Sequence, residues 1–222
     1  MNIVASLAWI GAGISLIGTG RYVIGIIKDG TRPRLASWIA WFVANVVLTI
    51  VAFLSGAYLA ATFNALASLG NAGVLIAGAA KRTGERPTGK SDWTCLGVAA
   101  VCSAIIMIFP RLAMLGALLA MVANVIATWP TMQHAWKRPF AETWQLFAAN
   151  AGASLLGLIS VASVSGLRLT TIAGPLIAML GNIALVSITL GRRYGTQIVE
   201  ELQEEIAELE ETVQPAEVHT LD

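Results

Sequence analysis

Residues 31–45 read TRPRLASWIAWFVAN, and residues 137–150 read KRPFAETWQLFAAN. Each stretch starts with basic residues and a proline, continues through a tryptophan, and reaches an asparagine within apolar sequence. The matched pairs lie 105 or 106 residues apart and are Arg32 with Arg138, Pro33 with Pro139, Trp38 with Trp144, Phe42 with Phe147, and Asn45 with Asn150. This order of matches predicts that a segment of the chain was duplicated.

A second pair of stretches extends the duplication. SLGNAG at 68–73 matches MLGNIA at 179–184, which pairs Asn71 with Asn182 at an offset of 111. The landmarks keep their order over a segment long enough for three membrane spans. We therefore expect two three-span repeats.

The composition places the chain in a membrane. Of its 222 residues, 56% are hydrophobic and 12% are charged, and the mean hydropathy is +0.73. A soluble domain could not bury that much apolar surface. Segments long enough to cross about 30 Å of hydrocarbon lie at 3–27, 35–55, 58–80, 93–109, 112–134, 143–165 and 170–190. Backbone groups in lipid must be satisfied within their own segment, so the sequence predicts an all-α, polytopic protein with seven transmembrane helices.

Basic residues predict the orientation. Eleven Lys and Arg residues lie in the loops after the first, third and fifth spans and at the start of the tail, against only Arg111 and Arg168 on the other side. The positive-inside rule then puts the N-terminus outside and the C-terminus in the cytoplasm, in the plasma (cell inner) membrane.

The same rule fixes how the repeats are arranged. Each repeat has three spans, an odd number, yet Arg32 and Arg138 lie on the same side. The fourth span therefore restores the orientation and gives a 3+1+3 plan of parallel three-helix repeats. The expected parts are a first repeat at 1–80, a basic loop and linker helix at 81–111, a second repeat at 112–193, and an acidic tail at 194–222.

The tail carries a short amphipathic segment. Residues 196–213 keep Val199, Leu202, Ile206, Leu209 and Val213 at heptad spacing, with seven glutamates on the other faces. Such a helix can dock on its own protein, stay solvated and partly frayed, or form a homo-oligomer. Residues 214–222 are expected to be disordered.

With these residues in place, the chain resembles the SWEET/PQ-loop transporter superfamily over roughly 3–193. The resemblance implies a 3+1+3 fold and transport of sugars or other small solutes. TWPTMQ at 128–133 keeps Pro130, with Thr131 in place of the glutamine of the family's Pro-Gln dipeptide. TFNALAS at 62–68 looks like the stretch that holds the family's sugar-binding asparagine, which would make Asn64 its counterpart.

Polar residues inside the spans are the candidate binding groups, because such residues are costly in lipid and usually face a bundle interior. We expect Asn71 and Asn182, with Asn64 nearby, to bind a solute, since an amide both donates and accepts hydrogen bonds. Asn45 and Asn150 either join them or bond between helices.

Four further residues are candidates for a gate or hinge. Trp41 and Phe42 either pack or gate, and Pro130 marks either a hinge or a static kink. Arg21 either reaches toward the cytoplasm or meets a gate partner. The tryptophans nearest the expected cytoplasmic ends should anchor the protein at the interface, and they are Trp38, Trp93, Trp136 and Trp144.

Several classes of protein are disfavoured. No metal-ligand spacing, nucleophilic triad or phosphate-cradling glycine pattern occurs, so we expect no enzyme, cofactor or metal, and no nucleic-acid partner. Glu142 and His134 lie at the edges of spans, which favours a facilitator over a proton symporter. We expect alternating-access transport of a small, neutral polar solute such as a sugar. The alternatives are a vitamin-precursor or amino-acid carrier of the same fold, or a non-transporting receptor or scaffold whose acidic tail is the working part.

Overall fold

Seven α-helices make up most of the chain in the computed structural model, which describes residues 3–109 and 112–212. The helices are α1 (Ile3–Lys28), α2 (Leu35–Leu54), α3 (Tyr58–Lys81), α4 (Lys90–Ile108), α5 (Ala113–Lys137), α6 (Trp144–Ser165) and α7 (Leu169–Thr212). All seven are long and apolar enough to cross a bilayer. The predicted all-α class and the seven predicted spans are confirmed, and the chain is an integral membrane protein.

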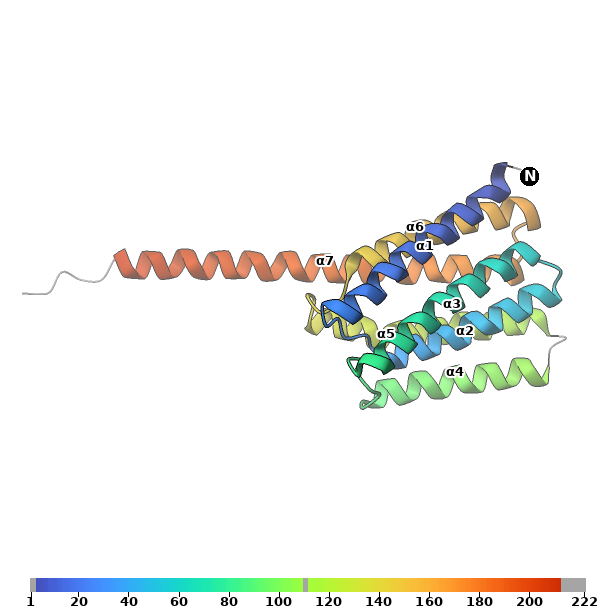
Figure 1. Cartoon of the computed structure of the whole chain (residues 1–222), viewed down its shortest axis with the longest axis horizontal. Coiled ribbons are helices and arrows are strands. Elements are labelled where there is room, and N and C mark those ends of the chain that lie inside the picture. Colours follow the sequence, from blue (N-terminus) through green and yellow to red (C-terminus); the bar gives the residue numbers. More distant parts are fainter. Residues whose placement is uncertain (1–2, 110–111, 213–222) are drawn as a thin grey trace, which may run out of the picture.

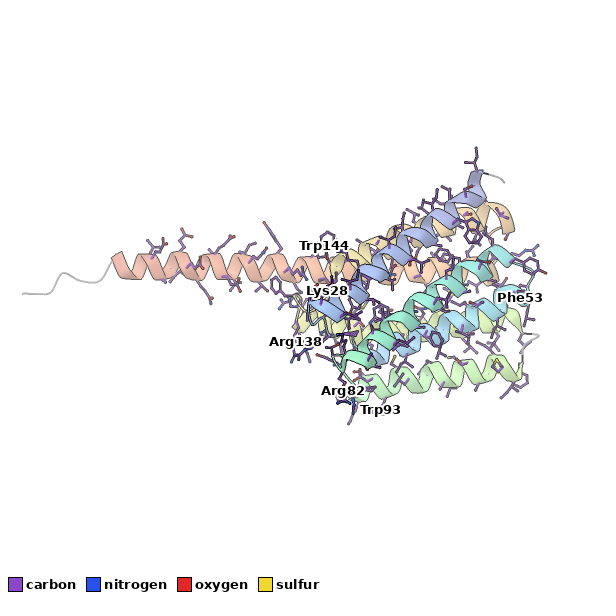
Figure 2. The ribbon with its side chains drawn as sticks, viewed as in Figure 1. Lys28, Phe53, Arg82, Trp93, Arg138 and Trp144 are labelled. Carbon is purple, nitrogen blue, oxygen red and sulfur yellow. The ribbon has the colours of Figure 1, made fainter. Side chains whose placement is uncertain are left out.

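The helices run alternately up and down between two ends (Figure 1). One end carries Lys28, Arg82 and Arg138, whereas Phe53 lies at the other (Figure 2). We call the first the basic end; it is formed by the loops 29–34, 82–89 and 138–143. Glycines with positive φ make the turns, with Gly30 at the basic end and Gly56 and Gly166 at the opposite end.

Six helices form a closed ring, and the seventh lies outside it. Around the ring, α1 packs on α3, α3 on α2, α2 on α5, α5 on α7, α7 on α6, and α6 on α1. Helix α4 packs only on α2 and α5 among the described helices. Its buried Cys95, Ala99 and Cys102 meet Ala123 and Ala127 of α5 there, and small side chains of this kind let helices approach closely.

Many large exposed side chains of the bundle are apolar. Ile17, Leu69, Ile76 and Val125, for example, are between 55% and 75% exposed. A monomeric soluble protein rarely leaves such contiguous apolar surface uncovered. Exposed apolar side chains over the length of the bundle are what hydrocarbon requires.

Helix α7 continues far beyond the bundle (Figure 1). It is a single helix of 44 residues, so the amphipathic segment of the tail extends the seventh span and is not a separate helix. Val199, Leu202, Ile206 and Leu209 are 52–58% exposed, so of the three alternatives the structure does not support docking of this stripe on its own bundle. Val213 and the predicted disordered stretch 214–222 lie outside the described residues, as does Arg111.

Candidate functional site

A cavity of about 80 Å³ lies inside the six-helix ring. Each helix of the ring contributes to its wall, whereas α4 does not. The lining residues are Ser15, Thr19, Trp38, Trp41, Asn45, Phe63, Asn64, Ala67, Asn71, Asn124, Thr128, Phe147, Asn150, Ser154, Gly174, Ile177, Ala178, Gly181, Asn182 and Leu185. None of these lining residues is charged, so the wall of the cavity offers amides, hydroxyls and aromatic rings.

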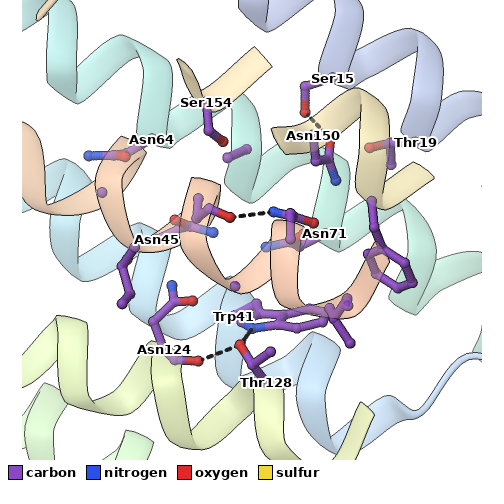
Figure 3. A pocket seen from close by; sticks show the side chains of 18 of the residues that line it. Ser15, Thr19, Trp41, Asn45, Asn64, Asn71, Asn124, Thr128, Asn150 and Ser154 are labelled. Atoms are coloured by element: carbon purple, nitrogen blue, oxygen red, sulfur yellow. Dashed lines mark hydrogen bonds between the residues drawn. The ribbon is translucent and has the colours of Figure 1, made fainter. Parts of the chain in front are cut away.

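The structure brings all five asparagines singled out from the sequence to this one cavity. They are Asn45 on α2, Asn64 and Asn71 on α3, Asn150 on α6, and Asn182 on α7. Asn124 on α5, which was not among the predicted binding residues, lines it as well. Figure 3 shows Asn45, Asn64, Asn71, Asn124 and Asn150 around the same space. An amide can donate two hydrogen bonds and accept others, so the wall can bind hydroxyl or amide groups of a neutral molecule.

Two of the hydrogen bonds between lining residues join neighbouring helices of the ring (Figure 3). Ser15 on α1 donates its hydroxyl to Oδ1 of Asn150 on α6 at 2.8 Å. Trp41 on α2 donates its indole N–H to Oγ1 of Thr128 on α5 at 3.2 Å, and that hydroxyl donates in turn to the backbone carbonyl of Asn124 at 2.9 Å. The bonds fix the orientation of Trp41 and Asn150. Asn150 therefore acts as an interhelical link as well as a lining residue.

Asn182 and Thr128 use their own helices to satisfy part of their bonding capacity. The amide nitrogen of Asn182 donates to the carbonyl of Ala178 one turn earlier, at 2.7 Å. An amide has a second N–H and a carbonyl oxygen beyond that bond. Asn182 therefore keeps a donor and an acceptor for the cavity.

Aromatic and aliphatic side chains close the cavity toward the basic end. This floor cluster is made of Tyr22, Ile26, Trp38, Val74, Ala77, Leu146, Phe147 and Leu185. The Tyr22 and Trp38 rings lie 5.4 Å apart, and Trp38 meets Trp41 edge-on at 5.2 Å. Trp38 is only 3% exposed, so the expectation that it anchors at the membrane interface is wrong. It lines the cavity and packs against Tyr22 of α1.

Helices α3, α6 and α7 meet closely at the other end of the cavity. A Cβ at Gly157 would lie 2.6 Å from the ring of Phe63. A side chain at Gly174 would likewise collide with the amide of Asn64. Glycines at 157 and 174 are therefore required for α3 to lie so near α6 and α7. Phe63 and Asn64 are buried at this contact.

Charged side chains gather beyond the floor cluster, at the basic end. Arg34 donates to Glu85 at 2.8 Å and, through Nη2, to Asp92 at 2.9 Å. Asp92 also accepts the backbone N–H groups of Thr88 and Gly89, both at 3.1 Å, and so caps α4. Arg138 binds the other oxygen of Glu85 at 3.2 Å. The network ties the loop 82–89 to the start of α2 and to the end of α5.

Glu142, predicted to lie at the edge of a span, is in the loop before α6 but is only 2% exposed. Its Oε2 accepts a long hydrogen bond of 3.4 Å from the hydroxyl of Tyr22, and its Oε1 lies 3.9 Å from Nε2 of His134. Burial raises the pKa of the Glu142 carboxyl to about 8, with the nearby charge of Glu85 adding to this rise and the hydrogen bond from Tyr22 opposing it. A peripheral position in the sequence therefore did not mean exposure to water.

The remaining gate and hinge candidates lie away from the cavity. Arg21 is exposed on α1, Phe42 is half-buried on α2, and neither lines the cavity. Pro130 is buried within α5, which continues through it to Lys137. Trp41 is thus the one member of this group, within the described chain, that contacts the site.

Four hydroxyl residues of the wall were not predicted from the sequence, and they are Ser15, Thr19, Thr128 and Ser154. The sequence does contain a signal for Ser15, Thr19 and Thr128. Ser15 and Thr19 are spaced by one helical turn, as are Asn124 and Thr128, and the two pairs are separated by the same offset of 109 residues. Hydroxyl groups in spans are common and inexpensive, since they bond to their own helix. That made them weak indicators when taken singly.

No group of three or more His, Cys, Asp or Glu side chains in the described part of the chain is placed to hold a metal ion. No protein-family model, curated protein or solved structure matches the chain. The chemistry of the cavity therefore has to carry the functional argument.

Proposed function

We propose that this protein is a membrane transporter that carries a small, neutral polar solute by alternating access. One observation carries the proposal: asparagines from five helices line a single uncharged cavity in the middle of a membrane-spanning ring. Polar side chains at membrane depth usually mark a solute path. Asn71 and Asn182 would bind the solute, with Asn45, Asn64 and Asn150 beside them.

We further propose that the ring consists of two parallel three-helix repeats, α1–α3 and α5–α7, joined by α4. The helix contacts support this, because α1 on α3, α3 on α2 and α1 on α6 correspond to α5 on α7, α7 on α6 and α5 on α2. Paired positions of the two halves also line the cavity together: Ser15 with Asn124, Thr19 with Thr128, Asn45 with Asn150, and Asn71 with Asn182. A solute site at the interface of two repeats is an established transporter plan, and the SWEET/PQ-loop resemblance agrees with it.

The mechanism would be a rocking of the two halves against each other. The bonds from Ser15 to Asn150 and from Trp41 to Thr128 cross from one half to the other. In this mechanism the floor cluster would close the basic end, and the close approach of Phe63 to Gly157 would close the opposite end. Opening either end would separate one of these contacts while the other stays closed. By the distribution of basic residues, the basic end would face the cytoplasm of a cell whose plasma membrane holds the protein.

The volume of the cavity and the absence of charge on its wall limit the class of solute that it could bind. At about 30 Å³ for each water in the liquid, 80 Å³ holds roughly three water molecules. A polyol as small as glycerol would fill such a volume, and a sugar requires the wall to move outward. The amino group and carboxylate of an amino acid would need charged or strongly polar partners at close range. A neutral hydroxylated solute is therefore favoured over an amino acid.

Counterflow in proteoliposomes tests the proposal. Vesicles containing the purified protein are loaded with unlabelled solute, and uptake of the labelled solute is followed for a panel that includes glycerol, erythritol, glucose and neutral vitamin precursors. Exchange that is at least tenfold above empty liposomes and is lost in Asn71→Ala/Asn182→Ala supports transport. Leu69→Ala, on the exposed face of α3, is the matched control and should transport normally. Full exchange by the double variant would overturn the role of the two amides.

The extension of α7 favours a second candidate, a receptor or scaffold. It projects from the bundle with an exposed apolar stripe and many glutamates, which is suited to binding another protein. Deleting 196–222 separates the candidates. A transporter retains counterflow after the deletion. A scaffold loses its cellular effect when 196–222 is deleted, whereas its Asn71→Ala/Asn182→Ala variant keeps that effect.

A further inference from the structure

Glu142 and His134 face each other in a buried place that the proposed solute path does not use. Oε1 of Glu142 and Nε2 of His134 lie 3.9 Å apart, and both atoms are buried without a hydrogen-bond partner. Buried polar atoms are normally bonded. Two such atoms that face each other, one a carboxyl oxygen and one an imidazole nitrogen, can share a single proton with a small movement. The other nitrogen of His134, Nδ1, lies 3.5 Å from Glu85.

Groups on several packed elements surround the pair. Tyr22 of α1 donates its hydroxyl to Oε2 of Glu142. Arg193 of α7 donates to the backbone carbonyl of Glu142 at 2.6 Å and to that of Pro139 at 2.9 Å, and so holds the loop while leaving the carboxyl free of a direct guanidinium bond. From the loop before α4, Glu85 adds a negative charge, which Arg34 and Arg138 bind. The carboxyl of Glu142 is therefore buried without a bonded cation.

The position of the pair connects it to the closure of the basic end. Tyr22 touches both Glu142 and Trp38, and Trp38 lines the cavity. Glu142 therefore lies directly behind the floor cluster. The contact also joins α1 to the loop between α5 and α6, which belong to different halves of the ring. If the halves separate at the basic end, Glu142 loses its cover and meets water.

We propose that Glu142 and His134 form a proton-binding site that holds one proton while the basic end is closed and releases it when that end opens. This inference rests on the proposed function, because it assumes that the basic end opens. The floor cluster lies between the site and the cavity, so the proton exchanges with the basic side. Protons on that side would therefore hold the gate closed, and the solute would still move downhill without proton coupling.

Burial sets the direction of the effect. The pKa of Glu142 is about 8 in this closed structure, and contact with water would return it toward the ordinary value near 4.5. Between about pH 4.5 and pH 8, opening therefore releases one proton. Over this range the ratio of open to closed molecules rises about tenfold for each pH unit. Below about pH 5 and above about pH 8 the ratio becomes independent of pH.

Thiol labelling of a cavity residue measures this ratio. Ala67 lines the cavity on α3, so Ala67→Cys is placed in the full chain after Cys95 and Cys102, both buried, are replaced by serine. The protein is reconstituted in sealed vesicles, and proteolysis of the α7 extension identifies those whose basic end faces outward. A membrane-impermeant maleimide is then added between about pH 5.5 and 8.5, a range that covers most of the expected transition. Thiol ionisation itself speeds labelling as pH rises, so each rate is divided by that of the same protein carrying Glu142→Gln.

The expected ratio is about ten at pH 5.5 and rises by about tenfold per unit to a plateau near pH 8. Glu142→Asp keeps a carboxyl and should retain a rise with pH, which a purely structural role would not give. Glu201→Gln, on the exposed α7 extension, should label like the unsubstituted protein. A ratio that stays flat while the introduced thiol labels from the basic side would overturn the proton site and leave the proposed function intact. Absence of labelling at every pH would overturn the opening of the basic end, and with it the release of the proton.

Discussion

Replacing Gly157 by alanine tests the close contact that shapes the end of the cavity away from the basic end. The added Cβ would lie 2.6 Å from Cε2 of Phe63 and 2.8 Å from Cζ. Carbon atoms pack best about 3.5–4.0 Å apart, so the ring has to move by about 1 Å. Overpacking of this kind costs about 1–3 kcal/mol. Gly152, on the same helix, has nothing within 4 Å of its Cβ position and provides the matched control.

Both substitutions gain the same helix propensity, about 1 kcal/mol, so their difference isolates the clash. We expect Gly152→Ala to be neutral or slightly stabilising, and Gly157→Ala to be about 1–3 kcal/mol less stable than Gly152→Ala. Reversible unfolding of the full chain in mixed micelles with increasing dodecyl sulfate, followed by tryptophan fluorescence, measures this difference. In a Phe63→Leu background the difference should fall below about 0.5 kcal/mol. Equal stabilities of the two alanine variants, or a difference unchanged by Phe63→Leu, would refute the packing argument.

Three further outcomes are expected in the same unfolding assay. Because burial raises the pKa of Glu142 to about 8, protonation of this carboxyl favours the folded state. The free energy of unfolding should therefore fall by about 1.4 kcal/mol per pH unit between roughly pH 5 and 8. Glu142→Gln should remove this slope, and an unchanged slope would assign it to other groups. Trp41→Phe removes the donor to Thr128 and should cost about 1 kcal/mol; it should add little to Thr128→Val, and full additivity would contradict the bond. Asp92→Ala removes the buried partner of Arg34 and the cap of α4, so it should lower the free energy of unfolding by about 3–5 kcal/mol. A decrease under about 1 kcal/mol would show that Arg34 is satisfied by water or by Glu85 instead.

The spans and the polar wall could be predicted because lipid imposes a simple rule on sequence. Backbone groups must bond within their own helix, so apolar segments of sufficient length are helices, and their predicted limits differ from the observed ones by only a few residues over most of the chain. The asparagines were identifiable for the same reason. An amide exposed to hydrocarbon is costly, so Asn71 and Asn182 had to face the interior of the ring.

What could not be predicted depends on how the helix ends pack. Glu142 and Trp38 lie at the limits of their spans, where sequence position is compatible with water, lipid or protein. Both contact Tyr22, which is 120 residues away from Glu142, and a hydropathy pattern carries no information about such pairing. The length of α7 was missed for a related reason: the change from apolar to acidic sequence marks where the helix leaves the bundle, and it does not end the helix.

The forces that close the two ends of the cavity differ in kind. At the end away from the basic end, glycines let helices touch, so closure there depends on shape and is insensitive to pH. At the basic end, the ion pairs of Glu85 with Arg34 and Arg138 are partly exposed, and such pairs contribute about 1 kcal/mol or less. Ionising the buried carboxyl of Glu142 would oppose closure by a larger amount, about 5 kcal/mol for a pKa moved from 4.5 to about 8. The floor cluster and the protonation of Glu142, more than the ion pairs, should therefore decide whether the basic end stays closed.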